Sequence, residues 1–286
     1  MSFGETVLLG ALAGFTIYLG LPFGRLQIMG NRARVGLAMF SVGVLAFLFV
    51  DIFEHAFEIL EEAFEGLKDG DQSAAEALGL LILLAAGFTA GTAGLAMLER
   101  RIRPKSPTPP PIAGGSVHAL PMEDAARLAQ ETENVRRRAL QVGMTIAAAI
   151  GVHNFAEGLA IGVSASTGEI ALATVLIIGF ALHNATEGFG IVGPLGSIRP
   201  SWSWLALAGL VGGGPVFLGA IVGYNVNSEP LELAFYGLSG GAILYVIGEV
   251  WLGMRRYGHR ELGLWLLCAG FLVGIATDLV IVYGGG

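Results

Sequence analysis

The sequence has few charged residues and almost no cysteine. Only 14% of its 286 residues are Asp, Glu, Lys or Arg, whereas soluble domains carry about 25%. The formal net charge is −7 with only 16 Lys and Arg, so no basic surface is large enough to follow nucleic-acid phosphates. The single cysteine, Cys268, cannot form a disulfide within the chain. These shortages argue against a water-soluble enzyme and against a partner that is a nucleic acid.

Apolar residues are abundant instead, at 54% of the chain with a mean hydropathy of +0.69. A helix that crosses the hydrocarbon core of a bilayer needs about 20 apolar residues. Eight such segments occur, at residues 5–23, 35–60, 76–98, 139–163, 170–193, 203–224, 231–253 and 263–283. We therefore expect an all-α integral membrane protein, with residues 1–286 forming a single polytopic domain in the lipid bilayer.

Basic residues fall almost entirely on one side of this predicted bundle. All of the 16 Lys and Arg except Lys68 lie in the connections that follow the first, third, fifth and seventh segments. Connections rich in Lys and Arg stay in the cytoplasm. We therefore expect a multi-pass protein of the plasma or inner membrane with both termini outside and residues 100–137 as a flexible cytoplasmic loop.

The same short motif, His-Asn-x-x-Glu-Gly, occurs in the fourth and the fifth predicted helices. Its members are His153, Asn154 and Glu157 in the fourth helix and His183, Asn184 and Glu187 in the fifth. Positions i and i+4 share one face of a helix, about 6 Å apart along its axis. Each helix therefore presents an imidazole and a carboxylate together, at a depth where ionisable groups are costly and mark function.

This set of side chains favours a divalent metal ion. Imidazole, carboxylate and amide ligands suit zinc, and they also serve Cd²⁺, Fe²⁺, Mn²⁺ and Co²⁺. Consecutive membrane helices run antiparallel, so the two motifs fit an inverted-repeat transporter with its site near the middle of the membrane. We predict a metal site between helices 4 and 5, alternating access, and a metal that is the transported substrate, with no cofactor.

Three alternatives use the same residues. The His, Asn and Glu side chains could merely join the helices through hydrogen bonds. An intramembrane zinc-dependent hydrolase could hold zinc there and use Glu157 or Glu187 as its general base. A metal-gated sensor would bind the ion without moving it.

The two motifs resemble the paired signatures of the ZIP (Zrt/Irt-like protein) family of divalent metal transporters, most closely its bacterial GufA-like branch. The resemblance implies an eight-helix fold and uptake of metal ions, most of all zinc, toward the cytoplasm. It assigns the primary ligands to His153, Glu157 and Glu187. It further implies an adjacent second site of Asn154, Asn184 and the two glutamates, with His183 on the same pathway.

One family feature is missing from helix 6. ZIP proteins often carry a glutamate just before a proline there, whereas this chain reads Gly212-Gly213-Gly214-Pro215. The sequence thus lacks a ligand that a binuclear centre would use. We expect one well-occupied metal site.

Polar residues outside the two motifs mark a candidate pathway. Asp51, His55 and Glu58 follow i, i+4, i+7 spacing, so they share one stripe of helix 2. Glu249 in helix 7 is either part of a release path or an interfacial carboxylate paired with a nearby arginine. Small residues on the helix faces would permit a homodimer.

Overall fold

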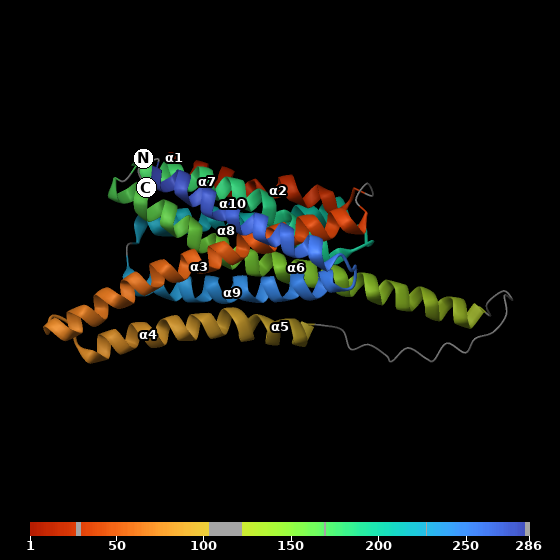
Figure 1. The fold of residues 1–286 in the computed structure, drawn as a ribbon, viewed down its shortest axis with the longest axis horizontal. Coiled ribbons are helices and arrows are strands. Elements are labelled where there is room, and N and C mark those ends of the chain that lie inside the picture. The colour runs from red at the N-terminus through yellow and green to blue at the C-terminus, as the bar shows by residue number, and fades with distance from the viewer. Residues whose placement is uncertain (27–29, 103–121, 169, 227, 284–286) are drawn as a thin grey trace.

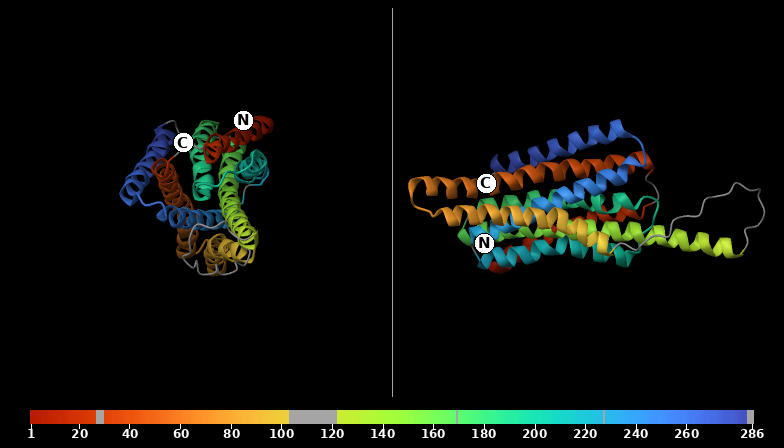
Figure 2. Two further views of the ribbon diagram at one scale, coloured as in Figure 1. Left: turned by 90° about the vertical axis from the view of Figure 1, so that its right-hand side faces the viewer. Right: turned by 90° about the horizontal axis from the view of Figure 1, so that it is seen from below.

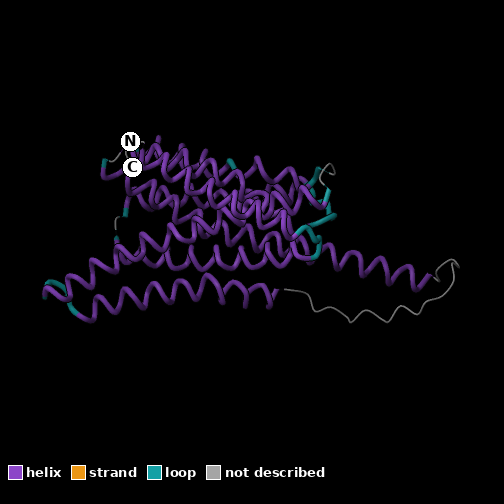
Figure 3. The backbone as a smooth tube through the Cα atoms, viewed as in Figure 1, coloured by secondary structure: helices purple, strands orange, loops and turns teal. Residues whose placement is uncertain are grey.

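The computed structural model describes residues 1–26, 30–102, 122–168, 170–226 and 228–283, and within these ranges the chain is helical with no strand (Figure 3). The helices are α1 (Phe3–Phe15), α2 (Ile17–Gly20), α3 (Asn31–Asp69), α4 (Ala74–Thr89), α5 (Leu95–Ile102), α6 (Met122–Thr167), α7 (Ile170–Val192), α8 (Trp202–Asn225), α9 (Glu229–Arg255) and α10 (Arg260–Tyr283). The long helices lie roughly side by side in one elongated bundle (Figure 1).

The eight predicted membrane helices are confirmed. The first consists of α1, α2 and a short 3-10 turn, and the third consists of α4 and α5 joined by a π-helical turn at Ala90–Gly94. Seven segments of the described part are long and apolar enough to cross a membrane. The eighth, α7, has 23 residues and packs among them.

Two helices are longer than the apolar pattern indicates. α3 has 39 residues and α6 has 46. Residues 122–137, which we expected to belong to a flexible loop over 100–137, form the first part of α6 (Figure 2). Ion pairs from Glu133 to Arg136 (3.4 Å) and Arg137 (3.1 Å) support the helix there, because side chains three or four residues apart are neighbours. Residues 103–121 lie outside the described residues.

Close packing divides the bundle into two groups of helices. α1, α6, α7 and α8 pack on one another, and α3, α4, α9 and α10 form the second group. Glycine permits this closeness at Gly158 in the first group, where an added Cβ would collide with the carbonyl oxygen of Val216. Gly43 plays the same part in the second group against Leu267. The two groups meet chiefly along α6 and α9 and along α3 and α7.

Both chain termini lie at the same end of the bundle as the α3–α4 turn (Figure 1). We call this the terminal end. The opposite end, where α9 stops and α10 starts, carries Arg25, Arg199, Arg255 and Arg260 and is called the basic end. Because both termini lie at one end, the chain runs along the bundle an even number of times, as eight membrane helices require. The side of the membrane that each end faces, and the inverted-repeat relation, stay predictions.

Candidate metal site

One carboxylate oxygen joins the two sequence motifs. Oε1 of Glu157 on α6 lies 2.9 Å from Nε2 of His153, and it also contacts Nε2 of His183 on α7. The ligand atoms of these three side chains all lie within 4.8 Å of one another. The i, i+4 spacing on α6 and the antiparallel course of α7 thus bring two imidazoles to one acid.

The remaining members of the motifs surround this cluster. Oε1 of Glu187 lies 3.8 Å from Nε2 of His153. Asn154 donates from Nδ2 to Oε2 of Glu187 at 3.2 Å and to the carbonyl of Gly212 at 2.9 Å. Asn184 donates from Nδ2 to Oε2 of Glu157 at 3.5 Å. The structure therefore brings all six predicted side chains together, between 0% and 9% exposed.

Several buried polar atoms of the cluster have no hydrogen-bond partner among the described residues. They are Oδ1 of Asn154, Oδ1 of Asn184 and Oε1 of Glu187. Buried polar atoms are normally paired, so each exception asks for an explanation. Every one of these atoms is a competent metal ligand. Unpaired ligand atoms on side chains that adjoin the cluster of His153, Glu157 and His183 are what a site for a bound cation requires.

Charge gives a second reason for a cation. Glu157 is 5% exposed and Glu187 is fully buried, and burying carboxylates without a compensating charge is costly. A divalent cation carries the charge that offsets both. Nitrogen and oxygen ligands with no thiolate suit zinc and other borderline ions and do not suit Cu(I).

Ser239 is a site residue that the sequence motifs did not indicate. It lies on α9, is fully buried, and its hydroxyl is 2.9 Å from Nδ1 of His153. An imidazole that binds a metal through one nitrogen usually donates from the other to an oxygen, which fixes the orientation of the ring. Ser239 can accept that hydrogen bond. Only the distance between the two side chains identifies Ser239, because nothing in the sequence links a serine of α9 to the motif of α6.

A cavity of about 450 Å³ leads away from the cluster toward the terminal end. Its wall includes His153, Glu157 and His183 of the cluster, together with the predicted pathway residues Asp51, His55 and Glu58. It also includes Glu232 and Tyr236 of α9 and Asp278 of α10. Glu54, His55 and Glu58 are exposed, so the cavity reaches the surface between α3 and its neighbours.

A hydrogen bond to the backbone fixes the ring of His55 in the cavity wall. Its Nδ1 lies 2.9 Å from the backbone carbonyl oxygen of Asp51. A carbonyl only accepts, so Nδ1 is the donor and Nε2 of the neutral ring keeps its lone pair. Nε2 is the atom with which His55 can bind a passing cation.

On the other side of the cluster, toward the basic end, the helices close on one another. Apolar side chains fill that space, each no more than 1% exposed: Leu45, Ile146, Ile150, Ile191, Ile243 and Val246. Glu249 lies on α9, ten residues beyond Ser239 in the direction of the basic end, and is apart from the cavity wall. The structure is therefore open toward the terminal end and closed toward the basic end.

The chain is similar to known proteins over most of its length. The sequence profile of the family described as "ZIP Zinc transporter" matches residues 2–248. A "Zinc transporter ZupT" from Corynebacterium glutamicum is 27% identical over 287 aligned positions, which cover 94% of this chain and 98% of the relative. The "Zinc transporter ZupT" of Streptococcus mutans is 24% identical over 286 positions, covering 96% of this chain and 97% of the relative.

A third relative matches a shorter part of the chain. "Zinc transporter ZIPB" of Bordetella bronchiseptica is 31% identical over 134 positions, or 46% of this chain and 43% of that protein. These relatives are named as transporters, so the hydrolase alternative has no support and the chain is not an enzyme. The match to the family over most of the sequence is confirmed by the helices and the His/Glu cluster, and the chain belongs to the ZIP zinc transporter family.

Proposed function

We propose that the chain moves divalent transition-metal ions, zinc foremost, across the membrane by binding them at the cluster of the two motifs. The observation that carries this proposal is the single oxygen of Glu157 that both His153 and His183 contact. The protons between these groups occupy the place that a cation would take. His153, Glu157, His183 and Glu187 then act as ligands, and the oxygens of Asn154 and Asn184 complete the set.

The cavity supplies the route into the site. Its wall carries the carboxylates of Asp51, Glu58 and Glu232, which attract a cation by their field. His55 offers a ligand nitrogen about one helical turn from Asp51. A hydrated ion can thus exchange water for protein ligands in steps before it reaches the deeper imidazoles.

Release requires the apolar closure toward the basic end to open. Leu45 belongs to one group of helices and Ile150 to the other, so the closure lies where the two groups meet. A relative movement of the groups would close the cavity and expose the cluster to the other side, as alternating access demands. In this scheme Glu249 lies on the exit side.

The basic end is proposed to face the cytoplasm, which makes the movement an uptake. The distribution of Lys and Arg supports this direction, as does the resemblance on which the sequence prediction rests. We also propose the plasma or inner membrane as the location and a homodimer as the assembly, which chemical cross-linking in native membranes would test.

Zinc flux into sealed proteoliposomes tests the function. We expect uptake by the unmodified protein and its loss in the Glu157→Ala and Glu187→Ala variants. Glu131→Ala is the matched control, since Glu131 is an exposed carboxylate of the same helix α6 outside the cavity. Full uptake in both cluster variants would contradict the proposal, and binding without any uptake would indicate a sensor.

A further inference from the structure

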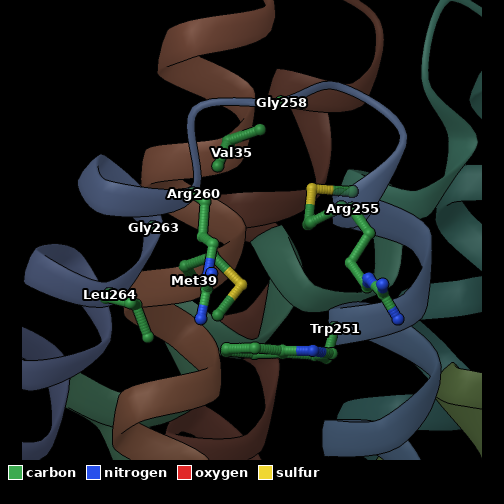
Figure 4. A pocket seen from close by; sticks show the side chains of 9 residues that line it. Val35, Met39, Trp251, Arg255, Gly258, Arg260, Gly263 and Leu264 are labelled. Carbon is green, nitrogen blue, oxygen red and sulfur yellow. The ribbon is translucent and has the colours of Figure 1, made fainter.

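A second cavity lies at the basic end of the bundle, far along the helices from the metal site. Its volume is about 370 Å³, and it lies between α3, α9 and α10 (Figure 4). The wall is apolar for most of its area. It is formed by Val35 and Met39 of α3, Trp251 and Met254 of α9, and Leu264 of α10.

Two arginines complete the wall. Arg255 is the last residue of α9 and Arg260 is the first of α10. Figure 4 shows their side chains reaching into the pocket from two sides, above the indole ring of Trp251. Both side chains are exposed. Two guanidinium groups therefore stand at the mouth of an apolar groove.

Neither guanidinium has an ion pair or a hydrogen bond within the described part of the chain. Arg256, between them in sequence, differs: it donates to the carbonyl of Pro194 at 2.7 Å and lies over the ring of Tyr257. Arg25 likewise donates to the carbonyl of Pro200 at 2.7 Å. The guanidinium groups of Arg255 and Arg260 are therefore available to an anion that enters the pocket.

We propose that this pocket binds an anionic phospholipid from the leaflet at the basic end. The phosphate would bind between Arg255 and Arg260, and an acyl chain would lie along Val35, Met39 and Leu264. Basic pockets between membrane helices suit anionic headgroups, and a tryptophan such as Trp251 favours the level of the headgroups. Free phosphate would leave the apolar wall uncovered, and a zwitterionic lipid would bring no net negative charge to the two guanidinium groups.

Every wall residue belongs to α3, α9, α10 or the turn that joins α9 to α10. The bound lipid therefore contacts only the second group of helices. It would hold this group to its leaflet while the first group, which carries His153 and Glu157, stays free to move. The lipid site is separate from the metal site in both its residues and its chemistry.

Native mass spectrometry of the full chain in neutral detergent tests the proposal. We expect dioleoylphosphatidylglycerol to bind more tightly than dioleoylphosphatidylcholine. The Arg255→Gln/Arg260→Gln variant should lose about five-fold in affinity for the anionic lipid for each arginine removed. Arg100→Gln/Arg101→Gln is the matched control, because it removes the same charge from α5 at the same end but outside the pocket, and its affinity should be unchanged.

Equal loss in both variants would overturn the proposal, since it would show only a general attraction of charge. An unchanged lipid preference in the pocket variant would overturn it as well, and so would inorganic phosphate that competes fully with the lipid. A photoreactive phosphatidylglycerol gives an independent measurement on the unmodified protein. Cross-links should map to residues 35–39 or 251–264, and cross-links confined to other parts of the chain would contradict the site.

Discussion

Nδ1 of His153 on α6 lies 2.9 Å from the hydroxyl of Ser239 on α9, and both side chains are buried. This hydrogen bond joins a candidate metal ligand of one helix group to a serine side chain of the other group. For Nε2 of His153 to bind a cation, Nδ1 must carry the proton and donate it to the serine. We therefore propose that Ser239 is a positioning residue for the proposed metal site.

Replacing Ser239 by alanine should weaken zinc binding by about 10–100-fold, the usual effect of removing such a support. The Nδ1 donor would lose its partner, so the orientation of the ring and of Nε2, the nitrogen that would bind the metal, would no longer be fixed. Isothermal titration calorimetry measures the affinity. Ser41→Ala is the control, because Ser41 is equally buried and its hydroxyl has no partner among the described residues. Equal affinity in the two variants would refute the role of Ser239.

Substitutions in the cavity should affect the capture of zinc more than its passage. In the Asp51→Ala and His55→Ala variants we expect a several-fold higher KM for uptake with a smaller change in maximal rate, since the cluster itself is intact. Uptake rates at increasing zinc concentration give both quantities. Glu62→Ala serves for comparison, because Glu62 is exposed on the same helix outside the cavity. A KM that stays at the unmodified value would remove these residues from the pathway.

The close packing of α6 on α8 should be sensitive to a single methyl group. Gly158→Ala places a Cβ against the carbonyl oxygen of Val216, and overpacking of this kind costs about 1–3 kcal/mol. Thermal unfolding in detergent should therefore occur at a lower temperature. Gly79→Ala in α4 meets no atom within 4 Å and should be neutral or slightly stabilising. Equal stability of the two variants would contradict the helix contact.

The ligand set should distinguish zinc from magnesium. Zinc at 100 times its dissociation constant should stabilise the protein by about 2.7 kcal/mol. Magnesium should give no comparable shift, because it prefers oxygen ligands and keeps several waters. A thermal-shift series across divalent ions measures this. Equal stabilisation by both ions would indicate an oxygen site rather than one built on His153 and His183.

The sequence was sufficient to predict the helices and the six members of the cluster, because apolar length and i, i+4 spacing are local properties. The sequence also predicted that Asp51, His55 and Glu58 share one stripe of a helix, and all three line the cavity. The start of α6 was predicted too late. Its first turns are charged rather than apolar, and ion pairs such as that between Glu133 and Arg137 support the helix there.

Other parts of the site depend on distances between helices and could not be predicted. Ser239 and Tyr236 come to the site through the crossing of α9 over α6, and no periodicity within α9 indicates it. The apolar closure near Ile150 and the pocket of Arg255 and Arg260 likewise arise from the way that helices distant in sequence pack together.

X-ray absorption spectroscopy of the zinc-loaded protein tests the central claim most directly, because it reports the atoms around the ion. We predict scattering from imidazole rings, with zinc–nitrogen distances of about 2.0–2.1 Å, together with oxygen and no sulfur. The imidazole contribution should fall in the His153→Ala and His183→Ala variants. A shell of oxygen alone in the unmodified protein, or an imidazole signal that survives both substitutions, would contradict the account.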